Sequence, residues 1–199
     1  IPKGFDLTRF KPSLETDLLP TELMKDDSSL LISVCRLDPR KNLKSLIEAM
    51  QLLRDWKLKK DVKLVIVGDG IERSFLETEV QKANLTDRVY FVGALKNDGA
   101  ELPQFYAASD LFVLPTLYEG FGWVFAEAMA SGLPIITTDV GSNPEVVGDV
   151  GVLVPPRNPK ALATAIQDVL ASDKKRAKMS AKGLKKVRRD IRLEQAYWD

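Results

Sequence analysis

The sequence predicts an α/β domain with a Rossmann-like, doubly wound parallel sheet of six strands. Six short apolar runs recur along the chain, and most of them do not alternate with polar residues, which is typical of strands buried on both faces. Segments with helical spacing of apolar residues separate these runs, and such alternation produces right-handed parallel units. With 199 residues, 45% of them hydrophobic, the chain can form one well-developed core.

The expected strands and helices alternate from residue 30 onward. Strands are expected at residues 30–34, 62–67, 89–92, 111–114, 134–138 and 151–154. Helices are expected at residues 39–53, 71–83, 102–108, 123–131, 145–147 and 173–199. Asp38 is expected to cap the first helix and Pro39 to open it, because an aspartate side chain satisfies free helical N–H groups and proline suits the first turn.

The chain divides into three expected segments. Residues 1–29 form a linker and leading segment packed on the domain, anchored by Phe5 and Phe10 and including a short helix near residues 21–25. Residues 30–172 form the Rossmann-like domain, and residues 173–199 form a C-terminal basic helix and a truncated crossover. Because the chain begins at Ile1 rather than Met, we expect it to be a fragment of a longer protein.

The composition excludes several classes of function. A net charge of +1 gives no general attraction to nucleic acid, and no apolar run approaches 18 residues, so we expect a cytoplasmic protein. A single cysteine excludes an internal disulfide, and the absence of histidine removes the commonest general base and metal ligand. We therefore expect no metal and no cofactor, with any catalysis resting on carboxylates, cations and backbone groups.

The most informative stretch runs from the strand at residues 111–114 through a glycine-bounded loop into a helix. Gly120 and Gly122 leave N–H groups uncovered where the helix begins at Trp123, and a helix N-terminus attracts anions. Glu119 precedes this helix and Glu127 lies in its second turn, so both are expected to line the crevice at the strand's carboxyl end. Because a vicinal diol donates two hydrogen bonds to a carboxylate, the pattern favours a nucleotide sugar, with its phosphates on the glycine amides, its ribose on Glu127 and the transferred sugar near Glu119.

A simpler interpretation makes Glu119 a solvated loop residue and Glu127 a paired surface carboxylate. Twenty-eight acidic residues in 199 produce several pairs at this spacing by chance. The buried strands on either side, and the aromatic residue between the two glycines, favour a functional site.

A second polar loop follows the first expected strand and contains Arg36 and Lys41. The first and fourth strands of a doubly wound sheet flank its switch point, so this loop should face residues 120–122 across the crevice. Two cations opposite a helix N-terminus indicate a diphosphate site. The alternative is a solvated helix start with ordinary surface cations.

These motifs resemble those of a known family. Glu119-Gly120-Phe121-Gly122, followed by Glu127-Ala128-Met129-Ala130 and Gly132-Leu133-Pro134, is similar to the donor-site signature of the retaining GT-B glycosyltransferases of group 1. The loop with Arg36 and Lys41 is similar to the family's diphosphate-binding element, although Cys35 stands where the family often has glycine. The run 141–145 also resembles a family element, with Ser142 in place of a glycine.

The resemblance implies the C-terminal, donor-binding half of a GT-B enzyme that transfers a hexose from a nucleoside-diphosphate sugar, such as a UDP or GDP sugar, to an acceptor hydroxyl with retention. Residues 30–172 would be its nucleotide-sugar-binding domain. The N-terminal acceptor domain is missing, so the fragment is expected to bind the donor without transferring the sugar. Catalytic roles are implied for Glu119, Arg36 and Lys41, with no metal. The implied nucleotide-sugar-binding residues are Arg36, Lys41, Gly68, Leu95, Glu119, Gly120, Phe121, Gly122, Trp123 and Glu127.

Three alternatives remain at this point. A nucleotide-sugar epimerase or hydrolase would share the diphosphate site, and a nucleotide-binding module would bind without turnover. A Rossmann oxidoreductase would need a complete glycine motif, but after Gly68 and Gly70 the third position is Arg73. Nicotinamide binding is therefore disfavoured.

The C-terminal helix is strongly basic. Its expected apolar stripe consists of Ala177, Ala181, Leu184, Val187 and Ile191. The cationic face could contact an anionic membrane surface, which makes peripheral membrane contact one hypothesis. The interpretation we favour is a solvated face on a helix packed against the domain.

Overall fold

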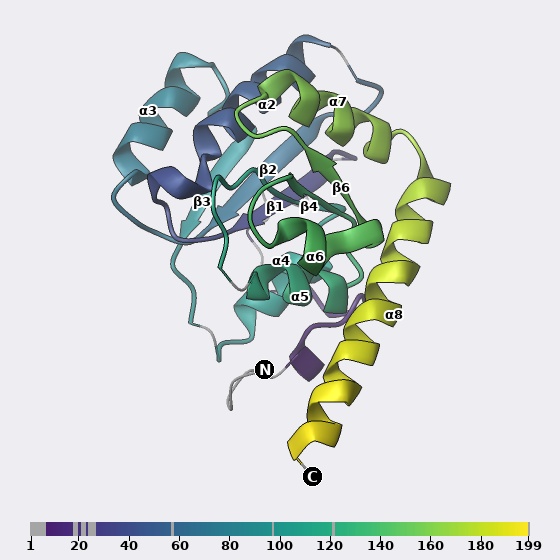
Figure 1. Cartoon of the computed structure of the whole chain (residues 1–199). Helices are drawn as coiled ribbons and strands as arrows, with labels where there is room; N and C mark the ends of the chain where they lie inside the picture. The colour runs from purple at the N-terminus through teal and green to yellow at the C-terminus, as the bar shows by residue number, and fades with distance from the viewer. Residues whose placement is uncertain are drawn as a thin grey trace.

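The fold is a parallel sheet between two layers of helices, seen in the computed structural model of the chain (Figure 1). The structure describes residues 7–17, 20, 23, 27–56, 58–96, 98–120 and 122–198, without the side chains of Leu7 and residues 190–198. Phe5 and Phe121 lie outside these described residues, and of the helix expected near residues 21–25 only Leu23 is described. In the described part of the chain, no helix is long and apolar enough to cross a membrane.

The sheet of the described residues has six parallel strands in the order β3-β2-β1-β4-β5-β6. The strands are β1 (Ser29–Val34), β2 (Val62–Val67), β3 (Val89–Gly93), β4 (Leu111–Leu114), β5 (Ile135–Thr138) and β6 (Gly151–Val154). β1 and β4 are neighbours, with Leu31 opposite Leu111 and Ile32 opposite Phe112. The chain therefore reverses its direction of winding between these two strands, and this is the switch point that the sequence predicted.

Helices cover both faces of the sheet. The helices are α2 (Leu43–Asp55), α3 (Arg73–Lys82), α4 (Glu101–Ala107), α5 (Trp123–Ala130), α6 (Asn143–Val147), α7 (Pro159–Leu170) and α8 (Asp173–Trp198), with the short 3₁₀ turns η1 (Leu7–Arg9), η2 (Pro39–Lys41) and η3 (Gly148–Val150). In Figure 1, α2, α3 and α7 lie on one side of the sheet, and α4, α5 and α6 lie on the other. The six-stranded, doubly wound prediction is confirmed.

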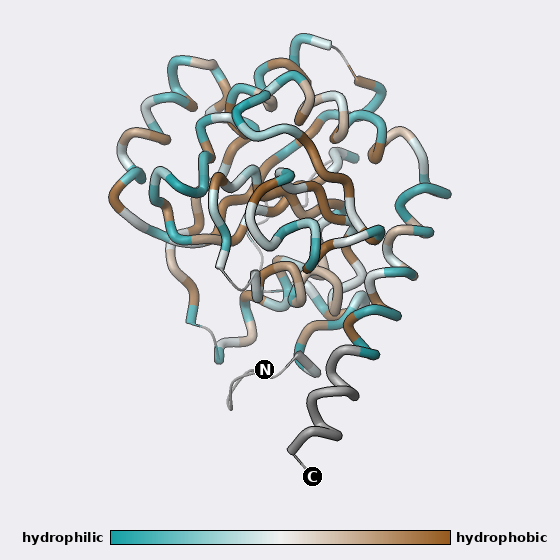
Figure 2. The backbone as a smooth tube through the Cα atoms, in the orientation of Figure 1, coloured by the Kyte–Doolittle hydropathy of each residue, from teal (hydrophilic) through white to brown (hydrophobic). Residues whose placement is uncertain are grey.

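Two apolar clusters, one on each face of the sheet, make the core. One joins the sheet to α2, α3 and α7, and the other joins it to α4, α5 and Phe10 of the leading segment. Figure 2 shows the result, with the most hydrophobic segments running through the strands and the hydrophilic ones on the outer helices. Since β1, β2, β4 and β5 are almost entirely buried, their continuous apolar runs follow from burial on both faces.

The start of the first helix differs from the prediction. Asp38 accepts a hydrogen bond from the N–H of Arg40, but the turn that it caps is η2. Asn42 then adopts a left-handed conformation with φ of 52°, and α2 begins at Leu43. Asparagine tolerates this conformation better than most residues, so it separates the two helical segments.

Helix α7, at residues 159–170, was not among the expected helices. The local signals are present, because the Asn158 side chain accepts a hydrogen bond from Ala161 N and Pro159 occupies the first turn. Leu162, Ile166 and Val169 are buried at helical spacing against the sheet.

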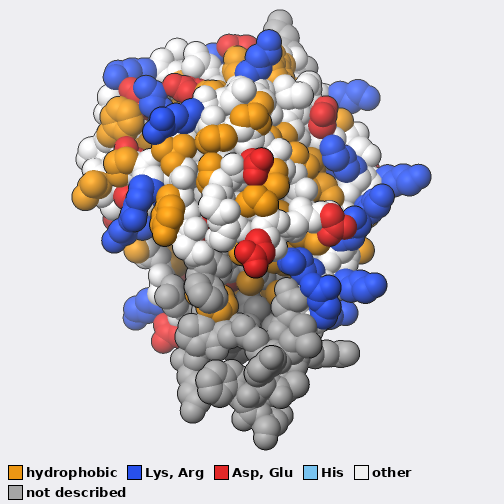
Figure 3. Space-filling model, viewed as in Figure 1, with side chains coloured by type: hydrophobic (Ala, Val, Ile, Leu, Met, Phe, Trp, Pro, Cys, Tyr) orange, Lys and Arg blue, Asp and Glu red, His pale blue; other side chains and the backbone are white. Residues whose placement is uncertain are grey.

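The apolar stripe expected on α8 was partly wrong. Ala177 and Ala181 are exposed, whereas Met179, Gly183 and Val187 are buried, so the buried face shares Val187 with the expected one but is rotated from it by about 100° around the helix axis. Gly183 lies against Met129 of α5, where an added Cβ would come within 3.2 Å of the methionine side chain. A helix can approach another this closely only through a small residue. Lys and Arg side chains gather along the outer edge that α8 forms (Figure 3).

Candidate functional site

The carboxyl ends of β1 and β4 open into a cavity of about 320 Å³. It lies at the switch point of the sheet, where ligands bind in open α/β folds. Its lining residues are Val34, Cys35, Arg36, Asp38, Arg40, Lys41, Glu119, Gly122, Trp123 and Val124. Five of the residues expected to form the site, Arg36, Lys41, Glu119, Gly122 and Trp123, thus share one cavity although two separate loops supply them.

An ion pair joins the two loops inside this cavity. Lys41 Nζ donates to Glu119 Oε2 at 2.7 Å, and the two side chains are only 16% and 13% exposed. Partial burial makes the attraction stronger than that of a surface pair, since less water screens it. The cation and the carboxylate that the sequence singled out therefore lie in direct contact.

Asp38 organises two further cations at the rim. Its carboxylate accepts hydrogen bonds from Arg36 Nε at 3.2 Å and from Arg40 Nη2 at 3.1 Å. The hydrogen bonds from Arg40 are the main cause that lowers the pKa of Asp38. The Arg36 side chain remains 69% exposed, so its guanidinium retains donors for a ligand.

Backbone contacts lock the two loops together. Asn42 Nδ2 donates to the carbonyl of Pro115 at 3.1 Å, and the N–H of Leu117 donates to the carbonyl of Arg40 at 2.6 Å. Ser142, which stands where the related motif has glycine, lies with its hydroxyl 3.2 Å from the carbonyl of Glu119 and 3.0 Å from that of Gly120. The loop that carries Glu119 is therefore held from both sides.

The N-terminus of α5 faces the cavity through Gly122 and Trp123. Gly122 adopts φ of 63°, and an added Cβ would lie 2.7 Å from the Phe125 ring, so only glycine fits there without strain. Gly120 is exposed and does not line the cavity, and Phe121 lies outside the described residues. The N–H groups of the first turn of α5 provide the positive end of a helix dipole at this edge.

Glu127, one turn further along α5, does not line the cavity. Its side chain is buried on the side facing α4, where Tyr106 Oη donates to its Oε2 at 2.7 Å. Burial raises the pKa of Glu127 to about 7, against smaller lowering effects from the Tyr106 hydrogen bond and the charge of Arg9.

Gly68 and Leu95 also lie outside the lining of the cavity. Gly68 has φ of +133°, and an added Cβ would be 1.9 Å from the carbonyl oxygen of Cys35, so glycine is what lets the loops after β1 and β2 touch. Leu95 is half-buried against the apolar cluster on the α5 face of the sheet. Burial raises the pKa of the Cys35 thiol to about 12, so this lining residue is a neutral thiol at physiological pH.

The family follows from comparison with known proteins. The sequence profile described as glycosyl transferases group 1 matches residues 16–186 of the chain. The chain belongs to this family. The resemblance proposed from the donor-site motifs is confirmed.

Three similar proteins illustrate the group 1 relationship. O-antigen chain mannosyltransferase B of Escherichia coli is 35% identical over 149 residues, which are 74% of this chain and 38% of that relative. Sucrose-phosphate synthase from Thermosynechococcus elongatus has a TM-score of 0.81 and 32% identity, covering 99% of this chain and 51% of that one. Anabaena HepE in complex with UDP-glucose has a TM-score of 0.76 and 25% identity, covering 92% and 50%. The chain thus spans about half or less of the length of these relatives.

Three residues of this group 1 domain have contacts that the sequence did not predict. Asp38 was expected only as a helix cap, Arg40 was assigned no role at the rim, and Tyr106 was not considered. A charged run from Arg36 to Lys41 signals a cation cluster, but which acid serves which cation depends on the shape of η2. No local signal pairs Tyr106 with Glu127, because they come from different helices.

Proposed function

We propose that this domain binds a nucleoside-diphosphate sugar, as the donor-binding half of a retaining glycosyltransferase that transfers a hexose to an acceptor hydroxyl. The observation that carries the proposal is the convergence of Arg36, Lys41, Glu119 and the α5 N-terminus on one cavity at the switch point. Two cations and a helix dipole match a diphosphate in charge, and a carboxylate beside them matches the hydroxyl groups of a sugar. The UDP-glucose in the HepE structure supports the same ligand class.

The cations would stabilise the leaving group. Breaking the bond between the anomeric carbon and the diphosphate leaves negative charge on the phosphate oxygens, and no metal is needed where Arg36, Lys41 and the first amides of α5 carry that charge. Each well-placed donor contributes about 3 to 4 kcal/mol to such a transition state in a site that excludes water. In this proposal the acceptor oxygen bonds to the anomeric carbon on the same face, and its proton passes to the departing phosphate oxygen.

Glu119 would orient the hexose and stabilise positive charge at the anomeric carbon. The ion pair with Lys41 places a negative and a positive side chain next to each other. These would face the two opposite charges that the reaction develops, on the anomeric carbon and on the diphosphate. Lys41 would then serve both as a ligand of the diphosphate and as the ion-pair partner that holds the Glu119 carboxylate in place. Glu127 would accept hydrogen bonds from the ribose, as the resemblance implies.

Calorimetric titration of this chain with UDP, GDP and their sugars tests the proposal. Arg36→Ala should weaken diphosphate binding by about 10- to 100-fold, the equivalent of one charged hydrogen bond, while leaving nucleoside binding unchanged. Lys160→Ala removes an exposed cation of α7 and is the matched control. Failure to bind any nucleotide, or an equal loss for nucleoside and diphosphate in the Arg36 variant, would contradict the proposal.

Transfer by the whole protein needs a separate measurement. With the acceptor domain present, the anomeric configuration of the product, read by proton NMR, should match that of the donor. Inversion would exclude the retaining mechanism while leaving donor binding intact.

A further inference from the structure

The carboxylate of Glu127 has a single fixed partner. Among the described residues, the Tyr106 hydroxyl is its one hydrogen-bond donor, and it contacts Oε2 at 2.7 Å. Glu127 Oε1 receives no such bond from the described residues. It is also not among the fully buried side-chain atoms that lack a partner. A buried carboxylate accepts several hydrogen bonds when it can. One oxygen is thus occupied by Tyr106, and the other receives no hydrogen bond from the described residues.

Tyr106 is itself rigidly packed. Its ring is fully buried, stacks on Phe112 at 6.0 Å between centroids, and meets the edge of Phe10 at 5.5 Å. Aromatic pairs of these kinds fix the ring orientation, and a fixed ring fixes the direction of its hydroxyl. The phenol therefore cannot turn away from Glu127 without disturbing two other rings.

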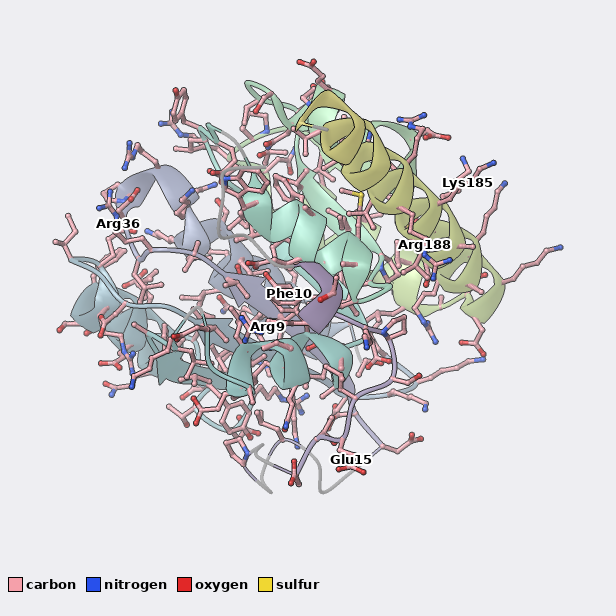
Figure 4. All side chains as sticks on the ribbon, turned by 90° about the horizontal axis from the view of Figure 1, so that it is seen from below. Arg9, Phe10, Glu15, Arg36, Lys185 and Arg188 are labelled. Atoms are coloured by element: carbon pink, nitrogen blue, oxygen red, sulfur yellow. The ribbon has the colours of Figure 1, made fainter. Side chains whose placement is uncertain are left out.

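One of these rings comes from outside the Rossmann-like domain proper. Phe10 follows η1 in the leading segment and is 5% exposed, next to Arg9, whose charge also acts on Glu127. Figure 4 shows Arg9 and Phe10 side by side, well separated from Arg36 at the loop after β1. The cluster around Glu127 thus forms a second polar centre, distinct from the cation cavity but on the same helix, α5.

We propose that Tyr106 is the positioning residue for Glu127: its hydroxyl holds one carboxylate oxygen so that the other faces the ribose of the nucleotide, with Phe10 holding the Tyr106 ring in place. This inference rests on the proposed function, because it assumes that Glu127 binds the ribose. The physical reason is pre-organisation. A glutamate has three rotatable side-chain bonds, and a ligand that must order them binds less tightly than one that meets them already ordered.

The readout that isolates this role is discrimination between a ribonucleotide and its 2′-deoxy analogue. The probes are UDP with 2′-deoxy-UDP, and GDP with 2′-deoxy-GDP, titrated calorimetrically. In the wild-type chain we expect the ribonucleotide to bind about 10-fold more tightly, the value of one hydrogen bond to a charged group. Glu127→Gln and Tyr106→Phe should both reduce this ratio, the second by about 3- to 10-fold.

Controls separate positioning from a structural effect. Tyr90→Phe removes a tyrosine hydroxyl that donates to the backbone carbonyl of Asp87, away from Glu127, and should leave the ratio unchanged. Should Tyr106→Phe unfold the chain, Phe10→Leu loosens the ring without removing the hydroxyl and should lower the ratio less, in the same direction.

The outcomes separate the role of Tyr106 from that of Glu127. A ratio that collapses in Glu127→Gln but stays at the wild-type value in Tyr106→Phe overturns the role of Tyr106 and leaves the proposed function standing. A ratio unaffected by Glu127→Gln removes Glu127 from the ribose site and overturns the inference with it. Equal loss of affinity for the ribo and deoxy ligands in Tyr106→Phe means that the residue is merely structural.

Discussion

Replacing Glu127 by glutamine should change how the stability of the domain depends on pH. The pKa of Glu127 is about 7 in the folded chain, and that of a free glutamate side chain is 4.5. Between these values the folded chain keeps a proton that the unfolded chain releases, so raising the pH through this window destabilises the fold. Glutamine has the same shape, can still accept the Tyr106 hydrogen bond and carries no charge, so the variant lacks this contribution.

The expected size of the effect follows from the two pKa values. Each tenfold difference in proton affinity corresponds to about 1.4 kcal/mol, so the displacement from 4.5 to about 7 amounts to about 3 kcal/mol. Near pH 4.5 the wild type and the variant should differ little on this account. By pH 8 the variant should gain about 3 kcal/mol relative to the wild type, or roughly 6 to 12 °C in melting temperature for a domain of this size.

Urea unfolding followed by circular dichroism between pH 4.5 and pH 8 measures the difference. Contributions from all other titrating groups cancel when the two curves are subtracted, provided that the m-value is unchanged. Glu101→Gln, at an exposed position of α4, is the matched control for the removal of one carboxylate. A constant difference between the wild type and Glu127→Gln would show that the carboxyl is solvated, and the burial argument would fail.

Two further predictions concern the loops and the basic helix. Gly68→Ala should destabilise the chain by at least about 3 kcal/mol, because the new Cβ would meet the carbonyl of Cys35. Gly120→Ala is the control: no atom lies within 4 Å of the new Cβ, so stability should change by less than about 1 kcal/mol. Equal melting temperatures for the two variants would refute this. On α8, exposed cations such as Lys185 and Arg188 (Figure 4) lead us to propose weak binding to anionic vesicles, at roughly 1 kcal/mol per cation. We expect the chain to sediment with anionic vesicles but not with neutral ones, and this binding should be lost at high salt and in the K185E/R188E variant. Equal sedimentation with the two kinds of vesicle would leave α8 as a solvated face.

The main site was predictable because its position follows from topology. Alternation of apolar strands and amphipathic helices indicates a doubly wound sheet, and such a sheet brings the loops after its first and fourth strands together. That rule is enough to place Arg36 and Lys41 opposite Gly122 and Trp123, as the structure has them.

Details within the loops were less predictable. The sequence pattern does not show that Asp38 serves two arginines, because this depends on the 3₁₀ shape of η2 and on the left-handed Asn42 that ends it. The buried face of α8 was misjudged because alanines suit either face of a helix, and only the close approach to Met129 selects Gly183. The missed helix α7 is a different case, since its cap and periodicity were visible in the sequence.

By itself, the sequence determined the class of fold, the order of its elements and the family, since these depend on periodicity and on short motifs whose residues are close along the chain. Only the tertiary structure decided which side chains meet. Lys41 and Glu119 are 78 residues apart, and Tyr106 and Glu127 are 21 apart on different helices. Such contacts depend on how helices and loops dock on the sheet, and docking is set by packing over the whole core rather than by any local run of residues.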